Sequence, residues 1–470
     1  MRGDEALGMV REALDGQRTW LVGGAVRDEL LGGGPATDID VILDGDVRRA
    51  ARALARATGA AAFELSGEFG AWRVIARDHS WQADLNPLRG GSLETDLGLR
   101  DFTVNAIARP LGGGPLIDPL GGAGDLAEGR LRLAGPEALR EDPLRALRLV
   151  RLSCELSLEP DAEACAAASS TATGLAGVAA ERVFGELKRI ILSERALAGL
   201  ELADRLGLSA VILPELDALA GVGQSRFHHR DVHGHTLEVL AGAIALERDP
   251  EALFDAEQGD GVRALLAEPL ADDLTRGGAL RFGALLHDVA KPATRRVTPE
   301  GRVQFPGHDE LGASMSREIL GRLRASERLG AHVATLVREH LRLGFLVREQ
   351  PLSRRTIYGY LDACDGVAVD VTLLSTIDRL ATRGDQAEAA TERHLAAART
   401  MLGYALRWHA DGRPAPLIRG DRLARELGIE PGPRLGGLLA RLAEAQFAGE
   451  AVTPEAAVSL ARQLICNELE

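Results

Sequence analysis

The sequence has few cysteines and almost no lysine, and these scarcities limit the class of protein. The four cysteines lie far apart and form no CxxC pair; they are Cys154, Cys165, Cys364 and Cys466. A disulfide framework and a zinc knuckle are therefore excluded, and we expect buried thiols in a reducing compartment. Of the 55 cationic residues only Lys188 and Lys291 are lysine, so a lysine is more informative here than any single arginine.

The chain also lacks a long uncharged run. The N-terminal segment, MRGDEALGMVREAL, carries acids and arginines where a signal peptide needs an apolar stretch. No later segment approaches the uncharged length of a membrane span, so we expect a cytoplasmic protein with no membrane partner. A net charge of -14 argues against a strong nonspecific grip on DNA or RNA. It allows a specific RNA substrate held by a local basic track.

Secondary-structure patterns divide the 470 residues into blocks. Up to about Leu133, short β-type runs (TWLVG, DIDVIL, AWRVIAR and WQADL) alternate with a helical run at residues 47–58, which predicts an α/β head. From Glu137 onward nearly every apolar pattern has the helical period. Residues 249–278 look like an insertion that connects helices, and residues 409–416 look like a linker before a last helical module.

The most informative stretch covers residues 21–43, where Gly23 and Gly24 precede Asp38 and Asp40. Residues i and i+2 of a strand point to the same face. Two carboxylates at that spacing repel each other unless a cation lies between them, so the pattern predicts a Mg²⁺ platform. The glycines predict a turn whose bare backbone can approach phosphate. An edge strand with a solvated acidic end would show the same pattern.

Four further motifs follow in order: LETDLGLRDFTVNAIA, LIDPLGGAGDLAEGRLR, EDPLRALRLVRL and ERVFGELKRIIL. Together with the first stretch they resemble the class II tRNA nucleotidyltransferase and bacterial poly(A) polymerase family over nearly the whole chain. The resemblance implies an α+β, mainly α protein whose N-terminal head has a polymerase-β-like nucleotidyltransferase fold. It also implies that an RNA 3′-hydroxyl attacks a nucleoside triphosphate, with Mg²⁺ held by Asp38 and Asp40.

The resemblance also suggests the remaining residues of the head site. Asp84 in WQADL is the candidate third carboxylate, unless it is a strand-end acid that faces water. The expected nucleotide-binding residues of the head are Gly23, Gly24, Arg27, Asp28, Arg100, Asp101 and Asn105. Asp101 could equally cap a helix. Leu99 stands where the family often has a second arginine, which removes one expected phosphate contact.

The EDPLR motif predicts how the base is chosen. Asp142 and Arg145 lie three residues apart and would share a helix face. A carboxylate accepts from the exocyclic amine of cytosine or adenine while a guanidinium donates to the adjacent ring nitrogen, an order that uracil and guanine reverse. A surface salt bridge is the alternative for such a pair. Arg148 continues the same face toward triphosphate or RNA, and Arg182 and Glu186 predict an i,i+4 ion pair in the neck.

A second metal site is expected in the body of the protein. HTLEVL supplies His235, LLHDVAKP supplies His287 and Asp288, and LLSTIDRLATRGD supplies Asp378. This order resembles the ligand set of HD-type metal phosphohydrolases, including the HD module fused to many of these tRNA enzymes. Imidazole and carboxylate ligands suit a divalent metal such as Ni²⁺, Mn²⁺ or Mg²⁺.

Three auxiliary residues accompany this ligand set. Lys291 would face the substrate phosphate, or it would be a cation at a helix end before Pro292. His308 and His340 would hold phosphate or a second metal, or they would be solvent-exposed or capping histidines.

We therefore expect a nucleotidyltransferase head (residues 1–133), a neck for nucleotide and RNA recognition (134–225), an HD phosphohydrolase-like domain (226–400) and a helical tRNA-binding tail (401–470). The expected activity is transfer of CMP and AMP from CTP and ATP to the tRNA 3′ end. Only LNPLRGGS separates Asp84 from LETDL, whereas enzymes that add all three nucleotides commonly have a longer loop. CC addition alone is therefore an alternative. Poly(A) polymerase and an HD phosphohydrolase with an RNA-binding head are two others.

Overall fold

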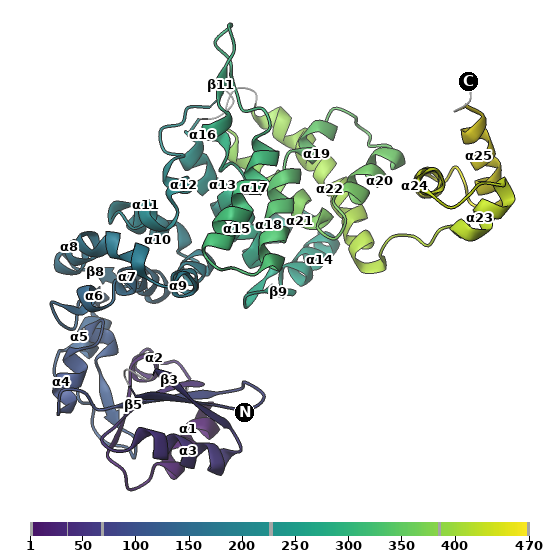
Figure 1. The fold of residues 1–470 in the computed structure, drawn as a ribbon. Helices are drawn as coiled ribbons and strands as arrows, with labels where there is room; N and C mark the ends of the chain where they lie inside the picture. The colour runs from purple at the N-terminus through teal and green to yellow at the C-terminus, as the bar shows by residue number, and fades with distance from the viewer. Residues whose placement is uncertain (1–2, 35, 67–69, 225–228, 384–386, 468–470) are drawn as a thin grey trace. The chain divides into compact units, whose positions relative to one another are not determined.

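The computed structural model describes residues 3–34, 36–66, 70–224, 229–383 and 387–467 (Figure 1). Contacts divide the chain into two compact units, Met1–Ile212 and Leu213–Glu470. The expected neck, residues 134–225, spans this division.

A six-stranded sheet with the order β3-β4-β5-β2-β1-β6 forms the centre of the head. Its strands are β1 (Thr19–Val22), β2 (Asp38–Leu43), β3 (Ala61–Ser66), β4 (Ala71–Ile75), β5 (Gln82–Pro87) and β6 (Ala108–Pro110). β2 and β5 are parallel, whereas the other neighbouring pairs are antiparallel. The four β-type runs of the sequence are all strands, while β3 and β6 lie outside those runs.

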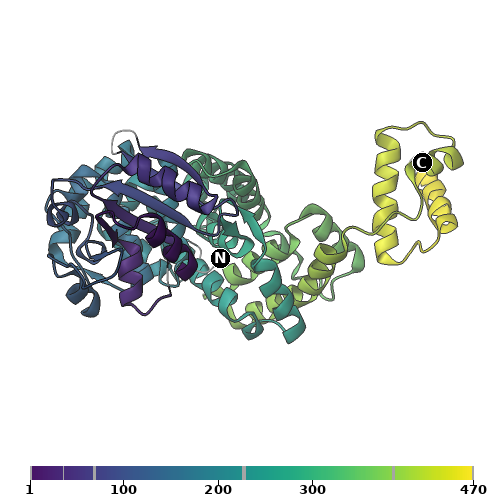
Figure 2. The ribbon, with the colours of Figure 1, turned by 90° about the horizontal axis from the view of Figure 1, so that it is seen from below.

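Helices α1 (Gly3–Ala13) and α3 (Val47–Thr58) cover one face of this sheet (Figures 1 and 2). α3 coincides with the helix that the sequence predicts. The core beneath these helices takes alternate side chains of β2, namely Ile39, Val41 and Leu43. Asp38 and Asp40 therefore lie on the opposite face, as the two-residue period of a strand requires.

Short helices complete the first unit. In the head they are α2 (Gly24–Leu30), α4 (Leu93–Gly98), η1 (Thr103–Asn105) and α5 (Gly122–Ala127). The short strand β7 (Arg130–Leu131) ends the head. The neck contains α6 (Ala138–Glu141), α7 (Leu144–Leu156), β8 (Glu159–Pro160), α8 (Ala162–Thr171), η2 (Ala172–Gly177), α9 (Ala180–Leu192), α10 (Ala196–Arg205) and α11 (Ser209–Ile212). α7, α9 and α10 pack against one another, which brings two of the sequence motifs side by side.

The second unit is helical, as predicted. Its first part contains α12 (Pro214–Asp217), α13 (Val232–Arg248), η3 (Pro250–Ala252), α14 (Ala256–Leu266), β9 (Pro269–Ala271), β10 (Leu274–Thr275), α15 (Arg276–Leu286) and α16 (Lys291–Thr294). The rest of the body contains β11 (Arg296–Val297), β12 (Val303–Gln304), α17 (His308–Arg322), α18 (Glu327–Glu339), α19 (Arg342–Leu346), α20 (Arg354–Ala363), α21 (Ala368–Ala381) and α22 (Ala387–Asp411). The predicted insertion at residues 249–278 has its own helix, α14.

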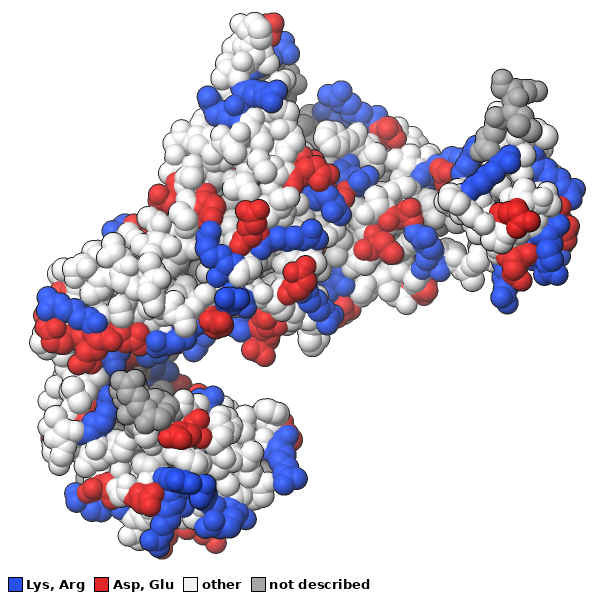
Figure 3. Space-filling view, viewed as in Figure 1, with Lys and Arg blue, Asp and Glu red and all other residues white. Residues whose placement is uncertain are grey.

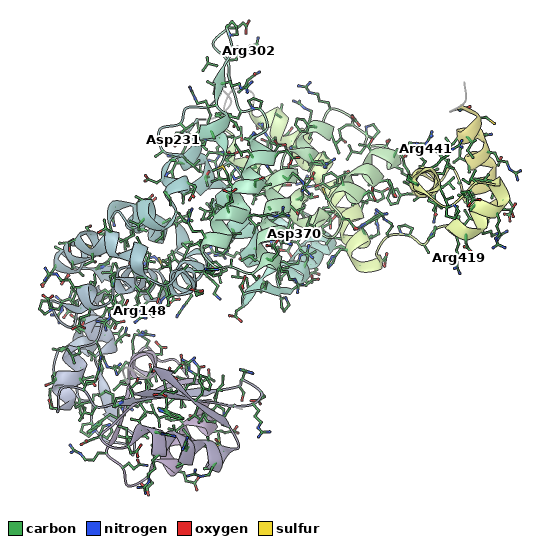
Figure 4. All side chains as sticks on the ribbon, viewed as in Figure 1. Arg148, Asp231, Arg302, Asp370, Arg419 and Arg441 are labelled. Carbon is green, nitrogen blue, oxygen red and sulfur yellow. The ribbon has the colours of Figure 1, made fainter. Side chains whose placement is uncertain are left out.

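One charged side chain is fully buried in the core of this body. Asp370, labelled in Figure 4, is 0% exposed on α21. It forms an ion pair with Arg276 of α15, and the Nε2 atom of His332 lies 3.5 Å from it. A carboxylate without such partners would be costly to bury, so these residues act as a structural network.

Three helices form the tail: α23 (Gly420–Leu427), α24 (Pro433–Ala448) and α25 (Pro454–Asn467). They enclose a small apolar cluster of their own that includes Leu423, Leu435 and Leu442. The segment between α22 and α23 confirms the linker predicted at residues 409–416, although α22 extends to Asp411. Figure 3 shows several cationic side chains on the tail, where Arg419 (labelled in Figure 4) has an 85% exposed side chain.

The cysteines and the membrane prediction can be compared directly with the structure. Cys154 and Cys364 are buried, but Cys165 is only partly buried and Cys466 is exposed. The expectation of buried thiols is therefore wrong for Cys466, which lies near the end of α25 where one side of the helix faces solvent. Across the residues that the structure describes, no helix is both long enough and apolar enough to span a bilayer.

Candidate active sites

The carboxylates of the head meet on the open face of the sheet. β2 and β5 are in register so that Asp40 pairs with Asp84 and Asp38 with Gln82. Gln82 Nε2 donates to Asp38 Oδ1 at 3.0 Å. Asp84 accepts two hydrogen bonds of 2.7 Å from the guanidinium of Arg73 on β4. The parallel pairing thus brings together three acids from two separate motifs.

The surroundings of Asp40 disfavour its charged form unless a cation is bound. Burial raises its pKa to about 6, and the charges of Asp38 and Asp84 add to that rise, while Arg100 opposes it. The fold therefore disfavours a bare charge at Asp40, and a bound cation would remove that cost. Three carboxylates without a nitrogen or sulfur ligand suit a hard ion such as Mg²⁺.

The glycine turn approaches these acids closely. Gly23 precedes α2 with a φ of 70°, a conformation that side chains disfavour. A Cβ atom on Gly23 would lie 3.0 Å from Asp40 Oδ2. Arg27 lies in α2, and its Nη1 donates to Asn105 Oδ1 at 2.6 Å. As predicted, Arg27 and Asp28 belong to the first helix after the turn, and Asp28 Oδ1 accepts from Arg27 Nε at 2.8 Å.

A hydrogen-bonded chain continues from Asn105 into the neck. Asn105 Nδ2 donates to Asp101 Oδ1 at 3.0 Å, and Arg148 Nη1 donates to Asp101 Oδ2 at 2.9 Å. Burial raises the pKa of Asp101, but the charge and hydrogen bond of Arg148, together with the hydrogen bonds from Asn105 and the backbone of Phe102, lower it, so the net shift is downward. Asp101 is not the cap residue of η1, because Phe102 occupies that position, but Asp101 Oδ1 accepts from the backbone N of Phe102 at 2.8 Å. Arg148, labelled in Figure 4, thus joins the head motif to helix α7.

Arg100 has a different role from the other arginines. Its side chain is 16% exposed and its Nε lies 3.8 Å from Asp96 Oδ1. Burial lowers the pKa of Arg100, while the charges of Asp40 and Asp96 raise it. This guanidinium is therefore held against the acidic cluster from inside the head.

Asp142 and Arg145 do not share a helix face, which corrects the sequence prediction. Asp142 precedes α7 in an extended conformation, with φ at -142° and ψ at 97°. Pro143 explains this, since a proline disfavours helical dihedrals in the residue before it. Asp142 Oδ1 accepts from Leu144 N at 3.2 Å, while Arg145 Nη1 donates to Ala138 O at 2.9 Å. The two side chains are held separately.

The predicted ion pair between Arg182 and Glu186 is also wrong. Arg182 Nη2 donates to Asp142 Oδ2 at 2.7 Å. Glu186 accepts from Arg148 Nε at 3.2 Å and from Arg151 Nε at 2.5 Å. Because α9 packs on α7, the neighbouring helix supplies closer partners than the i,i+4 position does. Arg182 therefore holds the turn before α7, and Glu186 holds α7 itself.

A single cavity of about 1140 Å³ within the first unit collects the head and neck candidates. Its lining includes every expected residue: Gly23, Gly24, Arg27, Asp28, Asp38, Asp40, Asp84, Arg100, Asp101, Asn105, Asp142, Arg145 and Arg148. Sites for single small molecules usually occupy roughly 300–1,000 Å³, so there is room for a nucleotide and a second group. Sequence reasoning missed Arg73, whose contact with Asp84 depends on strand register, and Glu141, which also lines the cavity.

In the second unit, the HD residues gather in two groups. His235, His287 and Asp378 offer ligand atoms within 4.8 Å of one another, and so do Asp288, His308 and His340. His235 Nε2 lies 2.9 Å from Asp378 Oδ1. These side chains lie on, or next to the ends of, five helices that pack together: α13, α15, α17, α18 and α21. The structure thus brings all the expected HD residues together.

Three of these histidines have the same orientation. The Nδ1 atoms of His287, His308 and His340 each contact a carbonyl oxygen three residues earlier, at 2.8, 2.7 and 2.6 Å. A donated Nδ1–H fixes the neutral tautomer with its lone pair on Nε2, the usual arrangement for a metal-ligating histidine. Burial, and then the charge of the neighbouring His287, lower the pKa of His340 to about 4.

Lys291 contacts the acid of the HD pair. Its Nζ lies 2.6 Å from Asp288 Oδ2 and 2.7 Å from Gln224 Oε1. Burial alone would raise the pKa of Asp288, but His287 and Lys291 bring it well below its usual range. Lys291 starts α16, so it is not the helix-end cation of the alternative interpretation.

Comparison with known proteins identifies the families to which the head, neck and body are similar. The Poly A polymerase head domain family matches residues 19–90 and 77–132, and the HD domain family matches residues 232–366. The family described as the probable RNA and SrmB-binding site of polymerase A matches residues 157–219. Two solved structures share the fold: a CCA-adding enzyme in complex with ATP has a TM-score of 0.65 at 17% identity, with 99% of this chain and 96% of that chain covered. A Thermotoga maritima CCA-adding enzyme complexed with tRNA has a TM-score of 0.61 at 17% identity, with 98% and 94% covered.

Two curated relatives match almost the whole chain. The A-adding tRNA nucleotidyltransferase of Deinococcus radiodurans is 38% identical over 444 residues, which cover 93% of each chain. The CC-adding tRNA nucleotidyltransferase of Thermus thermophilus is 36% identical over 443 residues, which cover 93% of this chain and 91% of that one. This protein is therefore an enzyme of the tRNA nucleotidyltransferase family with a Poly A polymerase head and an HD domain.

Proposed function

We propose that the enzyme transfers CMP and AMP from CTP and ATP to the 3′ end of tRNA, without a nucleic-acid template. The observation that supports this most directly is the single cavity that holds both the acids of the sheet and the EDPLR residues. The curated relatives are A-adding and CC-adding tRNA nucleotidyltransferases, so both nucleotides occur among close relatives. Building or repairing a CCA end requires both.

The acids of the sheet would support attack by the 3′-hydroxyl of the RNA. The hydroxyl oxygen forms a bond to the α-phosphorus, the bond to the β-phosphate oxygen breaks, and pyrophosphate leaves. Asp38 and Asp40 would hold Mg²⁺, which lowers the pKa of the hydroxyl and neutralises charge on the leaving group. Asp84 is fixed by Arg73 beside them, so it can complete the ligand set or orient the hydroxyl.

The remaining head residues would position the triphosphate. Gly23 leaves space beside Asp40 that a side chain would fill, so the backbone there can approach a phosphate. Arg27 supplies a guanidinium that Asn105 already orients. The chain of hydrogen bonds through Asp101 to Arg148 then ties phosphate binding to the neck helix that selects the base.

We assign base selection to Asp142 and Arg145, although their arrangement differs from the one that the sequence predicts. The two residues do not share a helix face, and in the part of the chain that the structure describes each pairs with another residue. Both line the cavity. Arg182 holds one oxygen of Asp142, and the carbonyl oxygens of Ala138 and Leu99 hold the guanidinium of Arg145. Separate anchoring would fix an acceptor and a donor at the spacing that cytosine and adenine need.

One observation favours the CC-adding alternative. Only residues 88–92 connect β5 to α4, and Arg89 is tied to Asp96 through its backbone N at 2.9 Å and its Nε at 3.3 Å. Gly90 also has no room for a side chain, because a Cβ would lie 2.3 Å from Thr95 Cγ2. A short, anchored connection leaves little freedom to rearrange between C and A addition.

A direct experiment tests the proposal and this alternative together. Transcripts of one tRNA ending before CCA, after C and after CC are incubated with each nucleotide alone and in pairs, and products are sized to one nucleotide. Addition of CC with CTP and of the final A with ATP supports the full activity. Arrest at CC in the presence of ATP supports the CC-adding alternative. Long A tails would indicate a poly(A) polymerase, and absence of any addition by folded protein would contradict the proposal.

For the HD body we propose a divalent-metal phosphohydrolase that acts on 2′,3′-cyclic phosphates or 2′-phosphates. His235, His287, Asp288 and Asp378 would hold Ni²⁺, Mn²⁺ or Mg²⁺, and the mixed nitrogen and oxygen donors fit such ions. Asp378 is the more accessible of the two acids, with 22% of its side chain exposed. Substrate phosphate would therefore approach from its side. If the head only bound RNA, its cavity would have no need for three acids that meet on one face of the sheet.

We further propose that these activities divide along the expected regions: catalysis in residues 1–133, recognition in 134–225, hydrolysis in 226–400 and tRNA contact in 401–470. The exposed Arg419 and neighbouring cations of the tail fit a surface that contacts RNA backbone without reading bases.

A further inference from the structure

We propose that the β-hairpin of residues 295–304 is an RNA-binding arm of the HD body, so that the substrate of this body is a phosphate at the end of an RNA strand and not a free nucleotide. The hairpin consists of β11 and β12 and connects α16 to α17. This inference rests on the proposed phosphohydrolase function, because it names the class of substrate that the same site receives.

The hairpin begins and ends at the rim of the HD site. The helix before it starts at Lys291, and the helix after it starts at His308. Both residues contact the carboxylate of Asp288, at 2.6 and 3.4 Å. The ring centroid of Phe305, at the base of the hairpin, lies 5.2 Å from Lys291 Nζ and 6.4 Å from the ring centroid of His308. A strand bound along the hairpin would therefore end next to the expected metal ligands.

The strands of the hairpin give it one cationic face. Arg296 pairs with Gln304 across the hairpin, and Thr298 N donates to the backbone oxygen of Arg302 at 2.9 Å. Alternate residues of a strand point to the same face, so Arg296 and Thr298 share a face with the residues opposite them. Both arginines, of which Arg302 is labelled in Figure 4, therefore belong to one face of the arm.

The two arginines are available to a ligand. Both are exposed, and within the part of the chain that the structure describes their guanidiniums form no hydrogen bond or ion pair. The hairpin carries three arginines and one acid, although the net charge of the chain is -14. Figure 3 shows cationic side chains near the tip and at the base of this projection, which Figure 1 labels at β11. Unpaired cations on one face suit the phosphates of an RNA backbone.

The length of the arm sets the size of the ligand. Arg302 lies three residues from Phe305, which corresponds to about 10 Å at roughly 3.3 Å per residue. A phosphate held beside Asp288 would not extend that far, whereas the strand that carries it would. A solvated surface is the alternative, because nearly all the cationic residues of this chain are arginine. In that case the arginines would affect the hydrolysis of no substrate.

The test compares an RNA strand with a small molecule at the same site. Arg296→Gln with Arg302→Gln removes both charges and keeps the backbone of the hairpin. Parent and variant, supplied with Ni²⁺ or Mn²⁺ in turn, are given a tRNA transcript that ends in a 2′,3′-cyclic phosphate and, separately, 2′,3′-cyclic AMP. In both reactions water adds to the phosphorus, and one ribose oxygen leaves and takes a proton.

The variant should raise KM for the transcript about tenfold and leave kcat unchanged, because only the hold on the strand is lost. The slope of log KM for the transcript against the logarithm of salt concentration should fall by about 1.4, since each contact with a single strand contributes about 0.7. Both constants for cyclic AMP should equal those of the parent. CTP incorporation into a tRNA that ends in a 3′-hydroxyl should also be unchanged.

Arg317→Gln with Arg328→Gln is the matched control, because these are exposed arginines of α17 and α18 that form no ion pair among the described residues. It should keep KM for the transcript within about twofold. An equal KM in parent and hairpin variant, or hydrolysis of cyclic AMP alone by the parent, would overturn the proposal and leave the phosphohydrolase function intact. An equal loss of CTP incorporation would show that the arm holds tRNA for the head instead. Hydrolysis of neither substrate by folded parent protein would contradict the phosphohydrolase function and the arm with it.

Discussion

Replacing Asp142 by alanine is the sharpest test of how the base is selected. Its Oδ2 atom is held by Arg182 at 2.7 Å, and its Oδ1 atom by the backbone N of Leu144 at 3.2 Å. A carboxylate held at two points can present a fixed acceptor to the exocyclic amine of cytosine or adenine. The alanine variant removes that acceptor and leaves the backbone turn, which Pro143 enforces.

The expected size of the effect follows from the exposure of the contact. A hydrogen bond to a charged group contributes about 1.5–3 kcal/mol. The side chain of Asp142 is 24% exposed and that of Arg182 is 51% exposed, so solvent weakens the electrostatic part of their contact and the lower end applies. A free-energy change of about 1.4 kcal/mol corresponds to a tenfold change in a rate or binding constant. Asp142→Ala should therefore lower kcat/KM for CTP by about tenfold and lower the preference for CTP over UTP by a similar factor.

Single-turnover incorporation with CTP, ATP, UTP and GTP, each over a range of concentrations, measures both quantities. Glu137→Ala is the matched control, because Glu137 is close to Asp142 in the chain, contacts Arg140 at 2.9 Å and is not one of the residues that line the cavity. This variant should keep the C/A preference. Arg182→Gln should weaken the preference less than Asp142→Ala, since the acceptor remains. An Asp142→Ala enzyme that loses rate but keeps the full preference would show that selection lies elsewhere.

Four further outcomes are expected. Asp40→Ala should abolish nucleotide addition and leave tRNA affinity within about twofold in a filter-binding assay, because a two-metal ligand stabilises the transition state by several kcal/mol; near wild-type addition would contradict the metal assignment. Because the pKa of Asp40 is raised from 3.8 to about 6, its ionisation costs the metal-free head stability as pH rises from 3.8 toward 6. The apparent Mg²⁺ affinity in steady-state addition should therefore fall about tenfold from pH 7 to pH 5, and a constant affinity would refute this. With residues 88–92 so short, CTP alone should extend tRNA by CC and ATP should then add slowly; an A step as fast as the C steps would reject the CC-only alternative. His287→Ala with Asp288→Ala should end metal-dependent phosphate ester hydrolysis while CTP incorporation survives, and the reverse pattern in a folded protein would contradict the division between the sites.

The parts of the fold that the sequence predicts depend on local patterns. The alternation in DIDV requires Asp38 and Asp40 to share a strand face, and the structure places them opposite the helix-covered core. The helical run at residues 47–58 is equally local, and α3 has the same bounds. Asp84 of WQADL is the candidate third carboxylate in the sequence, and the parallel pairing of Asp40 with Asp84 places it beside DIDV.

The failures arise where the partner of a side chain comes from another element. The i,i+4 spacing of Arg182 and Glu186 says nothing about their partners in other elements, which are Asp142 in the turn before α7 and Arg151 in α7. Arg73 is similar, since only the register of β4 against β5 places it opposite Asp84. The separation of Asp142 from Arg145 differs, because the proline between them is visible in the sequence and its effect on the preceding residue is general.

The two candidate sites differ in the chemistry of their ligands, and this difference suggests that they respond to different metals. The head offers oxygen atoms only, around a carboxyl whose pKa burial raises to about 6. The HD body offers four imidazoles, of which three have backbone carbonyls at Nδ1, together with two acids. Oxygen sites suit Mg²⁺, whereas imidazole favours transition metals. We therefore expect the HD body to bind a transition metal at concentrations too low to disturb nucleotide addition, because an ion that binds tightly to imidazole gains little from the carboxylates of the sheet.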